Sequence, residues 1–244
     1  MKGNRSPRIL SVVIFSMGAL LGVILIGITV WADFEAILFD PGLQEDTRLR
    51  TLRCPVVMTA EEIGTIRARV KNSLDRPTDL FVKAHISHGY VTLMREVNTR
   101  LSLDAGETEW VAWEINKDDA AFGSLVLFKV TVSGGYPLPT RQGTCGVVVI
   151  DAPYLNGSQI YGLTLALSLI GMVAGGALWI VNNPHMLGIQ VQLTRAMVFL
   201  AVSIGIGILV SFAGSWVLGG LFLIVILLAI GVIIGYFVNA NNAT

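Results

Sequence analysis

The sequence predicts a membrane protein of the α + β class, with four transmembrane helices and an extracytoplasmic β-sandwich inserted between the first two helices. Two observations carry this prediction. Charged residues make up only 14 % of the chain, against about 25 % in soluble domains, and all 17 acids lie between Asp33 and Asp151. Apolar and polar residues alternate with period two in that stretch, as in β-strands, whereas uncharged apolar runs of spanning length lie outside it.

The first element is a predicted transmembrane helix at residues 9–31. A bilayer core about 30 Å thick needs roughly 20 helical residues, and this run contains no charged residue. A cleaved signal peptide is the alternative, but its apolar core would be only about 7–15 residues long, and a good small-x-small cleavage site is missing here. Residues 1–8 carry three bases and no acid, so we expect a cytoplasmic N-terminus.

A linker, residues 32–50, leads into the predicted sandwich, residues 51–152. Its apolar residues could continue the helix or lie along the membrane surface, until Asp40-Pro41-Gly42 forces a turn. About seven short strands then alternate with turn signals over roughly 100 residues, which is the pattern of two packed sheets. The alternation predicts buried side chains at Ile66, Ala68, Val70, Leu80, Val82, Ala84, Ile86, Val111, Trp113, Ile115, Val126, Phe128, Val130 and Val132.

Two segments of this stretch resemble the immunoglobulin-like modules of bacteria and archaea. Residues 59–87, TAEEIGTIRARVKNSLDRPTDLFVKAHIS, carry an acid before a strand that ends in Val-x-Asn, followed by a turn and the next strand. Residues 103–115, LDAGETEWVAWEI, are similar to the later strand of these modules that Gly-Glu introduces. The resemblance covers only the central domain. It implies a binding or spacer unit and carries over no catalytic residue.

Three further transmembrane helices are predicted after the sandwich, at residues 158–181, 196–212 and 216–238. Residues 182–195 form a cytoplasmic loop, and residues 239–244 form a cytoplasmic tail. Every segment predicted to be cytoplasmic lacks acids, and aromatic residues lie at span ends, where amphipathic rings favour the membrane interface. We therefore expect an integral protein of the cell or cytoplasmic membrane with both termini in the cytoplasm.

Cys54 and Cys145 lie on apolar strand faces near the two ends of the predicted sandwich. An extracytoplasmic location favours a disulfide between them. A redox-active pair is one alternative, but active dithiols usually lie close in sequence, as in Cys-x-x-Cys. Unpaired thiols are the other alternative. We expect a structural disulfide that ties the first strand to the last.

No arrangement of catalytic or metal-binding residues stands out, so the sequence predicts neither an enzyme nor a cofactor nor a metal site. His85 on a polar strand face and His88 at a turn are three apart and diverge, and His185 stands alone in a loop. The neighbouring acids at 61–62 and 118–119 suit solvated turns. The predicted spans contain no charged residue, which argues against a pump or a proton-coupled transporter.

Small residues four apart recur in all four predicted spans. This spacing lets helix backbones approach closely, although glycine is common in membrane helices in any case. We expect a packed helical bundle. The residues are Gly18 and Gly22, Gly171 and Gly175, Ser203, Gly207 and Ser211, and Gly231 and Gly235.

Trp110 and Trp113 are three apart on one predicted strand and therefore face opposite sides. Trp113 shares its side with apolar residues, which predicts a core position. Trp110 shares its side with Ala112 and Glu114, which predicts a surface position. Aromatic anchors are enriched at contact hot spots, so Trp110 is a candidate partner contact. The alternative is that it packs beneath a loop of its own domain.

These features predict a non-catalytic accessory or scaffolding subunit of a membrane protein assembly. Its partners would be membrane lipid and other membrane protein subunits, and not nucleic acid. The sandwich would dock partners outside the membrane while the helices pack inside it. A basic row on one strand face, formed by Arg67, Arg69 and Lys71, suits either a solvated face or a partner site. A channel or permease component for a neutral or apolar solute is the alternative function.

Overall fold

The computed structural model of the chain has two compact units, each with its own hydrophobic core. A helical unit consists of Met1–Val30 and Tyr161–Thr244, and a sandwich unit consists of Trp31–Ile160. The structure describes residues 5–40, 47–134, 136–184 and 188–242.

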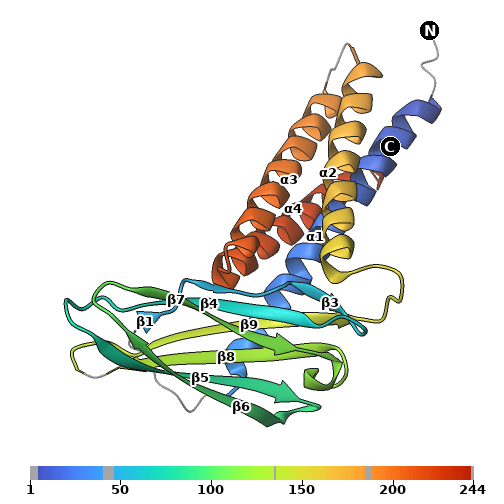
Figure 1. Cartoon of the computed structure of the whole chain (residues 1–244). Helices are drawn as coiled ribbons and strands as arrows, with labels where there is room; N and C mark the ends of the chain where they lie inside the picture. Colours follow the sequence, from blue (N-terminus) through green and yellow to red (C-terminus); the bar gives the residue numbers. More distant parts are fainter. Residues whose placement is uncertain (1–4, 41–46, 135, 185–187, 243–244) are drawn as a thin grey trace. The chain divides into compact units, whose positions relative to one another are not determined.

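Three helices are long and apolar enough to cross a membrane. The candidate spans are Pro7–Leu38, Gly157–Val181 and Gln190–Phe212, and they support a membrane protein. In the last helix the apolar stretch of described side chains, Trp216–Val232, is shorter than the roughly 20 residues of a span, so a fourth span stays a prediction. The helices are α1 (Arg5–Leu38), α2 (Gly157–Val181), α3 (Ile189–Phe212) and α4 (Trp216–Asn242) (Figure 1).

All four helices extend beyond the predicted spans, α1 and α3 the furthest, and α4 continues to Asn242, into the predicted tail. α1 continues through residues 32–38, part of the predicted linker, because no glycine or proline interrupts the run from Trp31 to Phe39. It stops before Asp40, which has a φ of 48° and precedes a proline, a position that disfavours helix. α3 begins at Ile189, inside the predicted loop 182–195, since the glutamines there are good helix formers.

The sandwich consists of two β-sheets. The larger has the order β1-β9-β8-β5-β6, with β3 also paired to β9, and the smaller has the order β2-β4-β7. β1 and β3 pair with β9 in parallel, and these short pieces explain why the described residues form more strands than alternation predicts. The strands are β1 (Thr47–Arg48), β2 (Leu52–Arg53), β3 (Val57–Thr59), β4 (Gly64–Lys71), β5 (Thr78–His88), β6 (Tyr90–Leu103), β7 (Thr108–Ile115), β8 (Leu125–Gly134) and β9 (Arg141–Ile150).

The core lies between the two sheets. Every side chain that the alternation predicts to be buried belongs to one buried cluster, to which both sheets contribute. The ring of Trp113 on β7 lies 5.1 Å from that of Phe128 on β8, measured between centroids, and so joins the sheets. β8 and β9 are buried on both faces over most of their length, so a second layer covers the larger sheet.

Candidate functional site

The end of α1 forms this second layer on the outer face of the larger sheet. Ala36 and Phe39 are buried and cluster with Leu127 of β8. Gly146 on β9 permits the close approach, because a Cβ there would lie 2.1 Å from the backbone oxygen of Ala32. Any larger residue at 146 would push the helix away from the strand.

A polar cluster lies where α1 ends on this sheet. The Oδ2 atom of Asp40 lies 2.5 Å from Nδ1 of His85, and the Asp40 carbonyl accepts a hydrogen bond from Lys129. Nε2 of His85 lies 3.3 Å from Oε1 of Glu96 but without hydrogen-bond geometry. The hydrogen bond from Lys83 to Glu96 holds the pKa of this carboxyl below its ordinary value. His85 is therefore on the polar face, as predicted, but it is buried there, in contact with Asp40, which follows α1.

The polar cluster connects the segment after α1 to the larger sheet, through the contacts of Asp40 with His85 and Lys129. Among the residues that the structure describes, no three or more His, Cys, Asp or Glu side chains converge on a common point that could hold a metal ion. His85 contacts Asp40 of the helix end, and His88 is exposed. His185 lies outside the described residues.

Two exposed aromatic side chains, Tyr90 and Phe122, form what we call the aromatic tip. They are 60 % and 73 % exposed, and their rings meet edge to face with 6.1 Å between centroids. Phe122 has a φ of 53°, and such a conformation costs a residue other than glycine about 1–3 kcal/mol. The loop before β8 thus holds a bulky ring outward in a conformation that phenylalanine rarely adopts.

The loop behind the aromatic tip is braced by hydrogen bonds. Asp119 is 2 % exposed, is paired with Arg95 of β6 at 3.0 Å, and accepts a bond from Ser87 through its carbonyl. The Phe122 N–H donates to the carbonyl of Gly89 at 3.0 Å. The sequence predicts a solvated turn carboxylate at Asp119, and this is wrong. The side chain is buried, because Arg95 balances its charge.

The outer face of the smaller sheet carries the predicted basic row and Trp110. Strand register sets Arg69 beside Trp110 and Arg53 beside Arg67. The Arg69 guanidinium carbon lies 5.9 Å from the centroid of the Trp110 ring, which is 53 % exposed. All four bases are exposed. We call Arg53, Arg67, Arg69, Lys71 and Trp110 the basic face.

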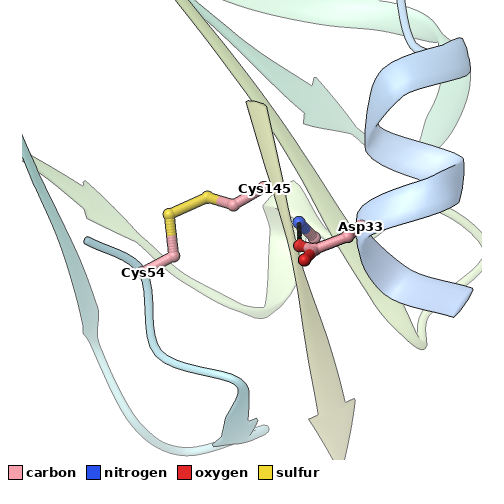
Figure 2. The surroundings of a disulfide bond; sticks show 4 residues. Asp33, Cys54 and Cys145 are labelled. Carbon is pink, nitrogen blue, oxygen red and sulfur yellow. Dashed lines mark hydrogen bonds between the residues drawn. A yellow bond between two sulfur atoms is a disulfide. The ribbon is translucent and has the colours of Figure 1, made fainter. Parts of the chain in front are cut away.

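Cys54 and Cys145 form a disulfide, as the sequence predicts (Figure 2). Cys145 belongs to β9 of the larger sheet and Cys54 directly follows β2 of the smaller one, so the bond joins the two sheets. The next residue of β9, Gly146, donates its backbone N–H to Asp33 of α1 at 3.5 Å. Figure 2 shows β9 held on one side by the disulfide and on the other by α1.

In the helical unit, the predicted packing glycines bring α1 and α2 into backbone contact. A Cβ on Gly18 would lie 2.6 Å from the Met172 nitrogen, and one on Gly175 would lie 2.5 Å from the Phe15 nitrogen. Gly171 faces Gly18 directly. Of the other candidates, Gly22 and Gly207 lie against isoleucine side chains, and Ser203 and Ser211 are buried. A Cβ on Gly231 would meet no described atom within 4 Å. The surroundings of Gly235 lie outside the described side chains.

No family model and no curated protein matches the chain. Among solved structures, the chain is similar in part to a β-glucuronidase from Bacteroides uniformis, at 20 % identity and a TM-score of 0.32 over 40 % of this chain and 12 % of that one. It is also similar to the CARDB domain of a Pyrococcus furiosus protein, at 15 % identity and a TM-score of 0.33 over 41 % of this chain and 84 % of that one. A Listeria innocua β-glucosidase matches at 16 % identity and a TM-score of 0.29, over 42 % of this chain and 16 % of that one.

These partial likenesses concern a β-sandwich module and carry no information about activity. The chain spans only 12 % of the length of the β-glucuronidase. The described residues combine three apolar helices of spanning length with one β-sandwich.

Proposed function

We propose that the protein is a non-catalytic accessory or scaffolding subunit of a membrane protein assembly, which binds partner subunits through its sandwich outside the membrane and through its helices inside it. The observation that carries the proposal is the aromatic tip. A strained and braced loop presents two aromatic rings to the exterior, and backbone strain of this kind clusters at functional sites. Exposed aromatic rings are suited to protein contacts because they bury a large area with little loss of conformational freedom.

Replacing Phe122 by asparagine is expected to weaken partner binding without unfolding the sandwich. Asparagine adopts positive φ more readily than phenylalanine, so the melting temperature should stay equal or rise while the apolar contact is lost. The measurement is purification of the full chain from its native membrane in mild detergent, with quantitative mass spectrometry of the proteins that accompany it. We expect partner recovery to fall about tenfold, as for a contact hot spot.

Phe81→Thr is the matched control. Phe81 is exposed too, at 53 %, but it lies on β5 with the Arg100 guanidinium carbon 5.3 Å from the centroid of its ring. Threonine suits a strand position of this kind. Partner recovery should be unchanged in this variant. Equal recovery from wild type and Phe122→Asn would remove the aromatic tip as a contact.

We also propose that both termini are cytoplasmic and that the sandwich is extracytoplasmic. The basic N-terminal tail and the disulfide support this topology, since disulfides persist in oxidising compartments. A cysteine introduced at Asn241 should be shielded from an impermeant thiol reagent in intact cells, whereas one introduced at the exposed Asp118 should react. Labelling at 241 without labelling at 118 would reverse the topology.

A further inference from the structure

The basic face brings like charges together, and Glu114, an acid on the same face, forms no ion pair with them. Arg53 and Arg67 lie directly opposite each other on β2 and β4, and like charges in this arrangement destabilise a sheet. Arg69 and Lys71 extend the same row along β4. No carboxylate among the described residues forms an ion pair with any of these four bases. An anion from outside the sandwich would relieve the repulsion.

Trp110 indicates what kind of anion this is. Its ring is exposed beside Arg69, on the same face as the unpaired bases. Indole rings favour the membrane interface, where an apolar body and a polar N–H are both accommodated. Clusters of lysine and arginine bind anionic lipid surfaces. The combination suits a lipid headgroup layer that contains phosphate groups.

A short segment joins the sandwich to α2. Residues 151–156 alone separate the end of β9 from the start of α2, and this link spans at most about 25 Å. Glu62 ties the start of α2 to the sandwich, because its carboxylate accepts a hydrogen bond from the Gly157 N–H at 2.8 Å. At the other connection, α1 runs without a break from the helical unit into the sandwich unit.

We infer that the basic face lies against the headgroup layer of the membrane that holds the helices, and that its bases bind the phosphates of anionic lipids there. The aromatic tip belongs to the larger sheet, because Tyr90 lies on β6 and Phe122 lies in the loop before β8. It therefore remains available for a protein partner. The inference therefore goes beyond the proposed function and stands or falls separately from it.

The test uses the full chain in nanodiscs of phosphatidylcholine, alone or mixed with phosphatidylglycerol, with a trace of lipid that carries a nitroxide on its headgroup. Subtracting the spectrum of the Trp110→Phe variant isolates the emission of Trp110. The nitroxide should quench this emission about twofold more strongly in the anionic discs. Salt at about 1 M should abolish the difference, because the Debye length is then about 3 Å.

Charge variants assign the effect to the basic face. A variant with Arg53→Gln, Arg67→Gln and Lys71→Gln should lose the lipid dependence of the quenching. The matched control removes three bases outside the basic face, through Lys83→Gln, Arg100→Gln and Lys117→Gln, and should retain it. Non-reducing peptide mapping of the Cys54–Cys145 bond verifies folding in both variants.

Two results would overturn the inference. Equal quenching of Trp110 in both kinds of disc would show that the basic face does not meet anionic lipid. Equal loss in the two charge variants would show that overall charge, and not this face, attracts the protein to the lipid. Neither result affects the partner recovery measured for Phe122→Asn, so a failure here is distinguishable from a failure of the proposed function.

Discussion

Replacing Cys54 and Cys145 by alanine is expected to lower the free energy of unfolding by about 4–5 kcal/mol. The two cysteines are 91 residues apart in sequence, and a cross-link over so long a loop greatly restricts the unfolded chain. The loss is a large part of the roughly 5–15 kcal/mol by which most domains are stable. Chemical denaturation of the full chain in detergent, followed by tryptophan fluorescence, measures it.

The reduced wild-type protein is the control for this double variant. Reduction removes the same covalent bond but keeps both side chains, so the two forms should unfold at similar denaturant concentrations. Non-reducing peptide mapping should find one linked pair in the untreated protein. A double variant as stable as the oxidised wild type would show that the sheets do not depend on the bond.

Trp113→Ala is expected to lower the free energy of unfolding by about 3–5 kcal/mol, as truncation of a large buried aromatic does. Trp113 is 4 % exposed and packs on Phe128 of the opposite sheet, so its loss leaves a cavity between the sheets. Trp110→Ala should cost less than about 1 kcal/mol, because an exposed ring leaves no cavity. The same denaturation experiment compares the two variants.

Trp113→Phe separates the packing of the ring from its polar group. The indole Nε1 of Trp113 is buried and has no hydrogen-bond partner among the described residues, so phenylalanine loses ring volume but no hydrogen bond. Its stability should lie much closer to wild type than that of Trp113→Ala. An equal loss from Trp113→Ala and Trp110→Ala would contradict the contrast between a core ring and a surface ring.

The core between the sheets could be predicted from the sequence because each strand there has one buried face, and period-two alternation records it locally. Val111, Trp113 and Ile115 illustrate this, since their neighbours are exposed. The disulfide could be predicted because the domain was expected outside the cytoplasm and both cysteines share strand faces with apolar residues. Period-two alternation is weak in β9, because this strand is buried on both faces. Its sequence therefore does not indicate which element covers its outer face.

The contacts of α1 with the larger sheet could not be predicted. Ala36 and Phe39 continue the apolar character of a membrane helix, and only the fold shows that they pack on Leu127. The opposition of Arg53 and Arg67 likewise depends on strand register, which no local pattern sets. The aromatic tip had a weak signal, since Tyr90 follows a glycine and Phe122 precedes one, and glycines of this kind mark turns that can display a side chain.

The end of α1 also has a consequence for folding. From residue 28 to residue 39 the chain contains neither glycine nor proline, so nothing in this stretch favours a kink in the segment that packs on β8 and β9. Gly146, His85 and Lys129 fasten that end to the sheet. Residues 31–39 therefore belong to the sandwich unit as much as its strands do. Unfolding of the sandwich would release this segment from β8 and β9.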